Sequence, residues 1–385
     1  MTHTVHILLE PSYIKPVWYV DSINSLRAGA AKRHYLVQDC YAADEIVKAH
    51  SASAAIVIST SDGWTQNAIA TLKRSGIRPI LVGAVPQSFG YDVSGTIYNR
   101  RASVEQLVHY FSRMGRDRIA LVGLNPVSSN DQEKQFAFIS AMAQLGLEAA
   151  SGDIFPVRHD LDDAIDAFLA APSRYNGAIC ANDYVAVALL AESARRKIRI
   201  PDDLVVAGFG NHLLGRCSKP TLTTATMDYR EMGVQALTIW ETLQANPKVS
   251  AIVLTVQHQI ICRGSTGHPE LAETIGTSGL PAGQYPNQRL DSSASLGRIN
   301  REIRSLEQCL RLCDELDYKI ICELLAGHSY EAIGFRLYLS RSALSRRLKK
   351  MYQLVDVSSR SSFLTLLNKY IANFSCLMQT VTSAQ

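Results

Sequence analysis

The stretch GAICANDYVAVALLAESARRKIRIPDDLVVAGFG, residues 177–210, decides the fold. It opens with a short apolar run at 177–181, continues with helical periodicity at 184–197, and ends with a second apolar run at 204–210. Neither run alternates apolar with polar residues, which is typical of strands covered on both faces. A strand, a helix and a strand in this order predict a parallel pair joined by a right-handed crossover.

The same alternation extends outward, from residue 5 to about residue 265. Further strand-like runs are VHILL (5–9), HYLVQ (34–38), AAIVIS (54–59), PILVGA (79–84) and RIALVG (118–123). Further helices are expected at 18–31, 64–75, 102–114, 131–145, 161–170 and 230–244. Repeated units of this kind predict α/β architecture with doubly wound parallel sheets, in which ligands lie at the carboxyl ends of the strands.

The composition indicates a globular protein with more than one folding unit. The chain has 385 residues, of which 47% are hydrophobic and 19% are charged, and this length exceeds what one core usually serves. Eight scattered cysteines without a CxxC pair indicate buried thiols rather than disulfides or a zinc site. The first residues lack the features of a signal peptide, and no run approaches the roughly 18 apolar residues of a membrane helix. We therefore expect a cytoplasmic protein and predict no cofactor.

Charge is divided unevenly along the chain. Residues 318–385 carry nine Lys and Arg against three Asp and Glu, a net charge of +6, whereas the preceding residues carry 30 against 32, a net charge of −2. A small basic domain behind a nearly neutral large one suggests that only the tail meets a polyanion. A solvated basic face is the alternative explanation.

Two segments connect the front of the chain to this tail. Residues 267–297 are rich in Gly, Pro, Ser and Thr without sustained periodicity, and predict a linker. Residues 298–314 predict a connecting helix with an apolar stripe formed by Ile299, Ile303, Leu306, Leu310 and Cys313. The stripe fits either a short coiled coil or packing on a neighbouring domain.

Five motifs of the front module, in this order, resemble landmarks of the LacI-type sensor domain. They are GRDRIALVG (115–123), GAICAND (177–183), IPDDLVVAGFGN (200–211), PTLTT (220–224) and IICRGST (260–266). The resemblance covers about residues 3–266 and implies a two-lobed, type I periplasmic-binding-protein-like sensor that holds an effector between its lobes. It implies crossings between the lobes near 97–102, 226–229 and 246–250. Lobe one would then comprise about 1–98 and 229–247, and lobe two about 99–226 and 250–266.

Ten residues are expected at the effector. Positions after the first and third strands nominate Tyr13, Trp18, Ser61, Asp62 and Trp64. The resemblance nominates Asn130, Lys134, Asn182, Asn211 and Met227. Aromatic rings beside hydroxyl and carboxylate groups suit a sugar-like or other polar ring compound.

Three of these neighbourhoods depart from the family pattern. Relatives commonly have Arg where Lys134 stands, Asp where Gly210 stands and a polar residue where Met227 stands. The effector is therefore an acid, an aromatic compound or an unusual sugar as readily as a common sugar. Of the pair that opens the helix at 184–197, we expect Asp183 to be the N-cap and Asn182 to contact the ligand.

The tail, residues 315–373 with an extension at 374–385, predicts an all-α domain. Its helical segments are 315–326, 329–337, 341–353 and 360–371. The order resembles the LuxR-type helix-turn-helix, with these residues in register: Gly327, Ser329, Ile333, Leu337, Ser340, Leu344, Leu348, Tyr352, Val357, Ser359 and Arg360. Ala332, Arg347 and Leu354 depart from that pattern. A helical protein-interaction domain is the alternative.

The third helical segment carries the predicted DNA chemistry. Leu344, Leu348 and Met351 share an apolar face. The residues expected on the exposed face are Arg341, Ser342, Ser345, Arg346, Lys349 and Lys350. The resemblance places Ser345, Arg346 and Lys349 at base edges, and the residues expected at phosphates are Ser329, Ser340, Arg341 and Lys350.

The order of the two modules is unusual for the front family. LacI-type repressors usually carry their DNA-binding helices first, whereas here the first strand begins at residue 5 and the helix-turn-helix candidate comes last. We expect a bacterial transcriptional regulator, a homodimer that binds a small-molecule effector and double-stranded operator DNA. No nucleophile elbow, phosphate loop or metal spacing predicts an enzyme. A sensor whose tail binds a protein partner remains the alternative.

Overall fold

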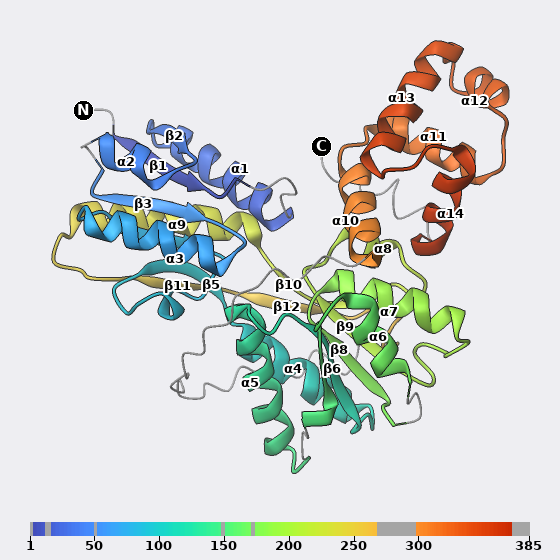
Figure 1. The fold of residues 1–385 in the computed structure, drawn as a ribbon, viewed down its shortest axis with the longest axis horizontal. Helices are drawn as coiled ribbons and strands as arrows, with labels where there is room; N and C mark the ends of the chain where they lie inside the picture. Colours follow the sequence, from blue (N-terminus) through green and yellow to red (C-terminus); the bar gives the residue numbers. More distant parts are fainter. Residues whose placement is uncertain are drawn as a thin grey trace.

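Two six-stranded sheets organise the computed structural model, which describes residues 3–11, 17–49, 52–147, 151–170, 174–267 and 298–371. Each sheet forms the centre of one α/β lobe, and a group of helices follows the second lobe in sequence (Figure 1). The two-lobed α/β architecture that the sequence predicted is confirmed.

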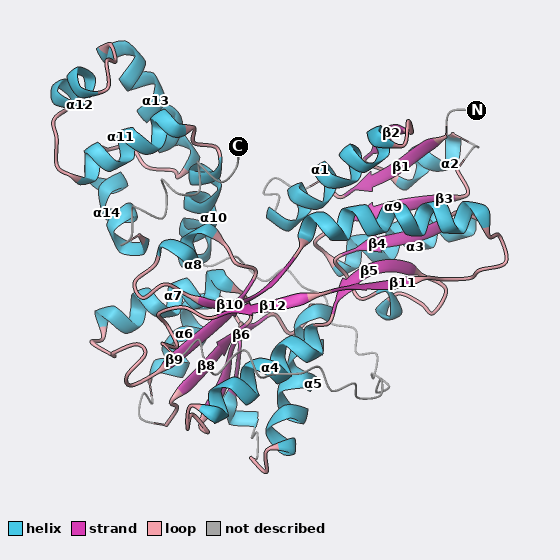
Figure 2. Ribbon diagram, turned by 180° about the vertical axis from the view of Figure 1, so that it is seen from behind, coloured by secondary structure: helices cyan, strands magenta, loops and turns pink. Residues whose placement is uncertain are grey.

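Lobe one is assembled from separate stretches of chain around a fully parallel sheet of order β11-β5-β4-β3-β1-β2. Its strands are β1 (Thr4–Leu9), β2 (Leu36–Cys40), β3 (Ala54–Ile58), β4 (Arg78–Val82), β5 (Ser94–Tyr98) and β11 (Val253–Val256). Its helices are α1 (Val17–Lys32), α2 (Ala43–Lys48), α3 (Asp62–Arg74) and α9 (Tyr229–Ala245). Helices α1 and α9 cover one face of the sheet, and α2 and α3 cover the other (Figure 2).

A close contact fixes α9 to lobe one although it follows lobe two in sequence. A Cβ atom added to Gly233 would lie 2.1 Å from the carbonyl oxygen of Ser22 on α1, so only glycine allows the two backbones to approach this closely. The Ser22 hydroxyl also donates to the carbonyl oxygen of Tyr229 at 2.9 Å.

Lobe two has the sheet order β12-β10-β9-β8-β6-β7, parallel except for the edge strand β12. Its strands are β6 (Ile119–Leu124), β7 (Ile154–Pro156), β8 (Gly177–Cys180), β9 (Val205–Phe209), β10 (Thr223–Met227) and β12 (His258–Ile261). Its helices are α4 (Arg100–Arg113), α5 (Ser129–Gln144), α6 (Leu161–Leu169), α7 (Asp183–Arg195) and α8 (Leu213–Cys217). The stretch 177–210 forms β8, α7 and β9, with Gly177 opposite Val205, as its pattern predicted.

The chain passes between the lobes at Asn99, Asp228 and Gln257. The third passage differs from the expected 246–250, and lobe one does not end at residue 247. After α9 the chain first adds β11 to the edge of the lobe-one sheet, where Val253 lies opposite Gly95. Only then does it cross to add β12 to lobe two. The free edge of β5 provides the hydrogen bonds that keep this segment in lobe one.

The tail consists of α10 (Arg298–Arg311), α11 (Glu315–Leu325), α12 (Tyr330–Arg336), α13 (Arg341–Leu354) and α14 (Arg360–Tyr370). Side chains of Asp314, Ser329, Ser340 and Ser359 cap the last four helices by accepting from a backbone N–H three residues later. The turn between α12 and α13 contains Tyr338 at a φ of 55°. That left-handed conformation reverses the chain sharply enough to set α13 across α12.

The apolar stripe of α10 packs inside this chain. Ile303, Leu306 and Leu310 are fully buried and belong to one apolar core that runs from lobe two through α10 into the tail. The hydroxyl of Tyr318 on α11 donates to the carbonyl oxygen of Leu310 at 2.5 Å. Of the two uses that the stripe allowed, packing on the neighbouring domains is the one observed.

One buried carboxylate ties α10 to lobe two. Glu307 is 1% exposed, and its two carboxylate oxygens accept the N–H groups of Leu213 and Leu214, each at 2.8 Å. These are the first two N–H groups of α8, which have no partner within their own helix. Arg311 donates its Nε to the same carboxylate at 3.0 Å.

None of the described helices is long and apolar enough to cross a membrane. Seven cysteines lie in the described part of the chain, and Cys40, Cys180, Cys217 and Cys309 among them are buried.

Replacing Glu307 should loosen α8 and α10 together. In Glu307→Ala the N–H groups of Leu213 and Leu214 lose their acceptors, and we expect amide exchange across residues 211–217 to become at least about tenfold faster. Hydrogen exchange followed by mass spectrometry on the full chain measures this. Gln308→Ala, on the exposed face of the same helix, is the matched control. Equal exchange in both variants would contradict the role of Glu307.

Candidate functional site

A cavity of about 380 Å³ lies between the lobes, and Arg304 of α10 is part of its lining. Lobe one contributes residues at the carboxyl ends of its strands, among them Ser59 and Thr60 after β3 and Gly83 after β4. Lobe two contributes Asn182 after β8 and Phe209 at the end of β9. The cavity therefore lies at the sheet edge where ligands of parallel α/β folds are expected.

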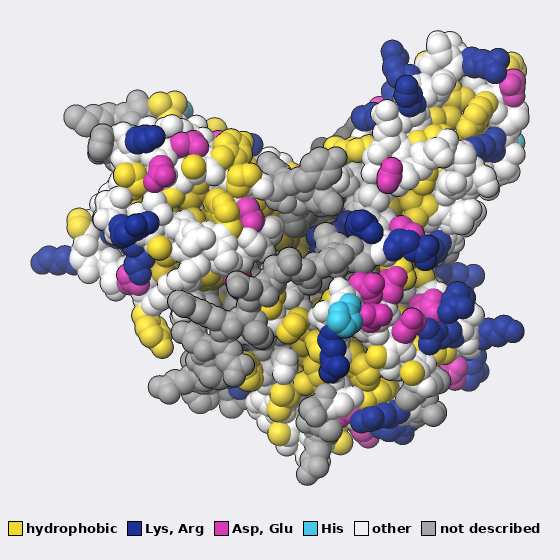
Figure 3. Space-filling view, viewed as in Figure 1, with side chains coloured by type: hydrophobic (Ala, Val, Ile, Leu, Met, Phe, Trp, Pro, Cys, Tyr) yellow, Lys and Arg dark blue, Asp and Glu magenta, His cyan; other side chains and the backbone are white. Residues whose placement is uncertain are grey.

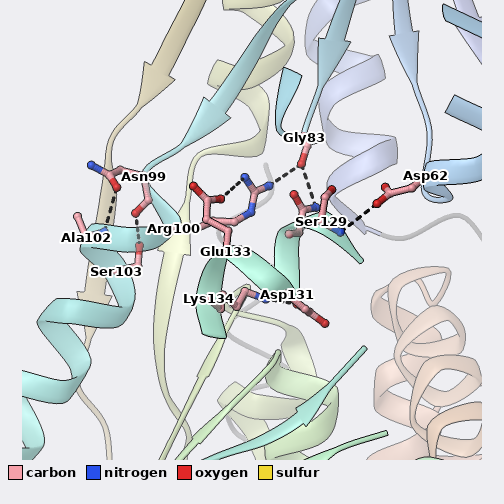
Figure 4. Close-up of polar contacts among 11 residues, drawn as sticks. Asp62, Gly83, Asn99, Arg100, Ala102, Ser103, Ser129, Asp131, Glu133 and Lys134 are labelled. Atoms are coloured by element: carbon pink, nitrogen blue, oxygen red, sulfur yellow. Dashed lines mark hydrogen bonds and ion pairs between the residues drawn. The ribbon is translucent and has the colours of Figure 1, made fainter. Parts of the chain in front are cut away.

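Hydrogen bonds join the two lobes across the cavity (Figure 4). Asp62 on α3 accepts the N–H of Ser129 at the start of α5 at 2.9 Å. The carbonyl oxygen of Gly83 in lobe one accepts from Asn130 at 3.3 Å and from Arg100 at 2.5 Å, and both donors belong to lobe two. The two lobes are therefore in contact at Gly83, which follows β4, and at Asp62, where α3 begins.

Arg100 is a buried cation that sequence reasoning missed. Its side chain is 2% exposed, and its guanidinium lies 4.1 Å from the ring centre of Tyr98. Apart from the bond to Gly83, Nε has no hydrogen-bond partner, and Nη1 has only the Glu133 carboxylate at 3.6 Å. Burial raises the pKa of Glu133, although Arg100 acts in the opposite direction. The position of Arg100, directly after a crossing between the lobes, was the sequence feature that could have identified it.

Lys134 is held by protein groups on two sides. Its ammonium donates to Asp131 at 2.8 Å and to the carbonyl oxygen of Ala181 at 2.6 Å, and it lies 5.1 Å from the ring centre of Phe209. Burial by itself lowers the pKa of Lys134, but the Asp131 carboxylate outweighs it and raises the pKa. The residue that stands in place of the family's arginine is therefore a charged link between α5 and β8.

Most of the ten nominated residues line the cavity, and some do not. The lining includes Trp18, Asp62, Asn130, Lys134, Asn182 and Met227. Tyr13 lies outside the described residues. Three nominations differ from the observed lining, namely Ser61, Trp64 and Asn211.

Each of these three side chains is taken up elsewhere. The hydroxyl of Ser61 donates to the buried carboxylate of Glu10 at 2.5 Å. Trp64 packs against the lobe-one core under α3. Asn211 accepts from the guanidinium of Arg263 at 2.6 Å. Contacts with other protein groups thus engage all three side chains outside the cavity lining.

The assignment of Asn182 and Asp183 has to be corrected. Asn182 has an extended backbone and accepts the N–H of Val185 at 3.1 Å, so it is the N-cap of α7 as well as part of the lining. Asp183 is 1% exposed and accepts from the N–H of His212 and the hydroxyl of Thr224, each at 2.7 Å. Asp183 thus fixes the loop after β9 rather than capping the helix.

Tyr184, His212 and Arg304 form one wall of the cavity that the sequence did not predict. The rings of Tyr184 and His212 are stacked, with centres 4.4 Å apart and an angle of 13° between their planes. Arg304 projects from α10, and its guanidinium lies 5.1 Å from the ring centre of Tyr184. The connecting helix α10 is therefore part of the cavity wall.

The exposed face of α13 is a second candidate site. Leu344, Leu348 and Met351 are buried, whereas the residues Arg341, Ser342, Ser345, Arg346, Lys349 and Lys350 are all exposed. Lys and Arg side chains stand on the outer edge of the tail near α13 (Figure 3). Arg347 differs from them, because it pairs with Asp314 at 2.8 Å and Asp317 at 2.7 Å. Ser329 and Ser340 are exposed N-caps.

Comparison with known proteins places the front module. Residues 108–266 match the family model of the periplasmic binding protein-like domain. Over 164 residues the chain is 26% identical to the NTD biosynthesis operon regulator NtdR of Bacillus subtilis (strain 168), covering 42% of this chain and 50% of that protein. Over 133 residues it is 30% identical to the HTH-type transcriptional repressor PurR of Vibrio cholerae serotype O1 (strain M66-2), covering 34% and 40%. The chain thus aligns with half or less of the length of these relatives.

The fold is also that of a solved regulator. A complex of the transcriptional regulator CelR with cellobiose has a TM-score of 0.58 at 14% identity, and the match covers 68% of this chain and 84% of that chain. Together with the family match, this likeness shows that the two lobes form a periplasmic-binding-protein-like fold.

The neighbours Asp183 and His212 should give opposite dependences of stability on pH. Burial raises the pKa of Asp183 to about 7, so this group stabilises the fold at acid pH and its contribution is lost as the pH rises towards 7. Burial lowers the pKa of His212 to about 4, so its contribution is present at neutral pH and is lost as the pH falls towards 4.

Substitution of either residue should reveal the pH dependence of stability that the other residue contributes. From about pH 4.5 to about pH 7 we expect the melting temperature of Asp183→Asn to rise more steeply than that of the wild type, and that of His212→Phe to fall relative to the wild type. Thermal unfolding in buffers of constant ionic strength measures both slopes. Parallel slopes in the two variants would show that one of these groups does not titrate as its burial requires.

Proposed function

We propose that the chain is a ligand-responsive transcription regulator, in which the cleft between the lobes binds a small-molecule effector and α13 binds double-stranded operator DNA. The observation that carries this proposal is α10, which lines the cleft with Arg304 and buries its apolar face in the core of the tail. A single helix thus belongs to both candidate sites. The relatives described as regulators and repressors support the same function.

The geometry of the tail supports a helix-turn-helix. Helices α12 and α13 are joined by a short turn at residues 337–340, and α13 presents its cationic face outward. None of Arg341, Arg346, Lys349 and Lys350 forms a salt bridge within the described residues, whereas Arg347 on the inner flank does. Cations without carboxylate neighbours are available for phosphates and guanine edges.

Roles on α13 follow from position along the helix. We assign Ser345, Arg346 and Lys349 to base edges in the major groove, and Arg341 and Lys350 to phosphates, with Ser342 beside them. Ser329 and Ser340 use their hydroxyls as caps, so their contribution to phosphate binding comes through the helix N-termini that they order.

Coupling between the sites runs through α10. Glu307 lies one turn after Arg304 and holds the first N–H groups of α8, which directly follow the cleft residue His212. A ligand that moves the His212 loop therefore acts on α10 and on the tail. We propose that the regulator acts in the cytoplasm as a homodimer whose two tails bind adjacent half-sites, and that it has no enzymatic activity.

One observation favours the alternative that the tail binds a protein partner. Phe335 is 86% exposed and Tyr338 is 97% exposed, and both adjoin the turn before α13. Exposed aromatic residues are enriched at protein interfaces.

Substitutions on α13 should separate sequence recognition from general affinity. On an operator selected from random DNA by the wild-type chain, Arg346→Ala should lose about 1–3 kcal/mol of binding free energy, with little loss on unrelated duplexes. Lys350→Ala should weaken both classes alike and reduce the dependence of affinity on salt by about one counterion. Gel-shift titrations of the full chain at several salt concentrations measure both effects.

Lys319→Ala is the control, because Lys319 is paired with Glu315 on α11, away from the proposed groove contact. Equal losses of Arg346→Ala on operator and unrelated DNA would refute the assignment of Arg346. Absence of any affinity of the wild-type chain for duplex DNA at low salt would favour the protein partner.

A further inference from the structure

Arg304 belongs to neither lobe, yet it forms part of the cleft wall. Its Nε donates to Asn300 one turn earlier on α10 at 2.7 Å, and its guanidinium rests against the ring of Tyr184. These two contacts orient the guanidinium towards the cavity. Burial lowers the pKa of Arg304, and Tyr184 acts in the opposite direction.

The other Lys and Arg side chains of the cleft are paired with carboxylates. Lys134 is neutralised by Asp131 at 2.8 Å. Asp62 accepts the backbone N–H of Ser129. Arg100 lies 3.6 Å from Glu133. Within the described residues, Arg304 is the lining Lys or Arg that forms no ion pair, and the lining carboxylate of Asp62 also forms none. The α10 wall of the cleft therefore offers a guanidinium without a carboxylate partner.

We propose that the effector is an anionic small molecule and that Arg304 binds its carboxylate or phosphate group. This inference deepens the proposed function and rests on it, since it names the chemical class of the ligand and a contact from outside the two lobes. A guanidinium binds a planar carboxylate or a phosphate with paired hydrogen bonds that are stronger than those between neutral groups.

The other lining residues indicate the chemistry of the rest of the ligand. Aromatic side chains of Trp18, Tyr184 and Tyr229 line it, and they suit the flat faces of a ring. Four buried polar atoms of the lining residues lack a hydrogen-bond partner, namely Nε and Nη1 of Arg100, Oδ1 of Asn130 and Nδ1 of His212. All three residues belong to lobe two. A ring with hydroxyl or amide groups and one acidic substituent satisfies this arrangement, and about 380 Å³ accommodates a single ring of that kind.

Binding by Arg304 would make the ligand a direct contact of the helix that carries the tail. In the absence of an anion the Arg304 charge stands unpaired against Tyr184, and the acidic group of the ligand would pull this part of α10 towards the cavity. The ligand would then act on the position of α10 without an intermediate loop.

Matched pairs of probes test the ligand class on the full chain. The pairs are glucose with glucuronate, glucose with glucose 6-phosphate, and benzyl alcohol with benzoate, which separate the carboxylate from the phosphate source and the sugar from the aromatic ring. Thermal shift ranks the probes and calorimetry measures their affinities. We expect the acidic member of at least one pair to bind about tenfold or more tightly than its neutral partner.

Variants of α10 then assign the contact. Arg304→Gln should remove the advantage of the acidic member, and Arg304→Lys should keep part of it. Arg301→Gln, an exposed arginine on the same helix, should leave it unchanged. If no acidic probe binds more tightly than its neutral partner, or if the advantage persists in Arg304→Gln, the proposal is wrong. The DNA affinity of the unliganded chain reports separately on the proposed function, because that affinity does not depend on the ligand class.

Discussion

The buried carboxylate of Glu307 accepts hydrogen bonds from the first two N–H groups of α8, and the placement of the tail depends on these bonds. A carboxylate without partners in the interior costs several kcal/mol, and each unpaired buried N–H group costs about 1–3 kcal/mol. Separation of α10 from α8 would therefore leave both the carboxylate and the N–H groups without hydrogen-bond partners. Together with the buried stripe of Ile303, Leu306 and Leu310, this contact makes α10 a part of the lobe-two core rather than a flexible connection.

Polar groups in the cleft fall into two classes with different consequences. Lys134, Asp131 and Asp62 are engaged by other protein groups, so they shape the cavity and join its walls. The unpartnered atoms of Arg100, Asn130 and His212 are different, because buried polar atoms without hydrogen bonds are rare in native folds. These atoms lose their hydration when the protein folds. A ligand that supplies their missing hydrogen-bond partners therefore binds more tightly. Specificity in this cleft thus follows from the few groups that the protein leaves unsatisfied.

The sequence predicted the elements whose patterns are local and missed those that depend on neighbours. The apolar runs that became β1, β3, β4, β6, β8 and β9 needed no other information. The runs SGTIY of β5, TTATM of β10 and HQII of β12 contain polar residues, and only pairing with adjacent strands makes them part of a sheet. The same holds for the site. Strand ends indicated Trp18 and Asp62, and the family resemblance indicated Asn182. Arg304 reaches the cleft from beyond the linker segment, through tertiary packing that no local pattern encodes.

In the proposed regulator, the continuous core of lobe two, α10 and tail constrains how a signal reaches DNA. If the lobes close by hinge motion at Asn99, Asp228 and Gln257, the tail travels with lobe two because they share one core. Lobe closure alone therefore leaves the tail fixed relative to lobe two. In a dimer held together by lobe one, the same closure changes the distance between the two tails, because each tail is carried by the moving lobe. In a dimer held together by lobe two alone, only a ligand that acts on α10 itself, through Arg304 or the His212 loop, can change that distance.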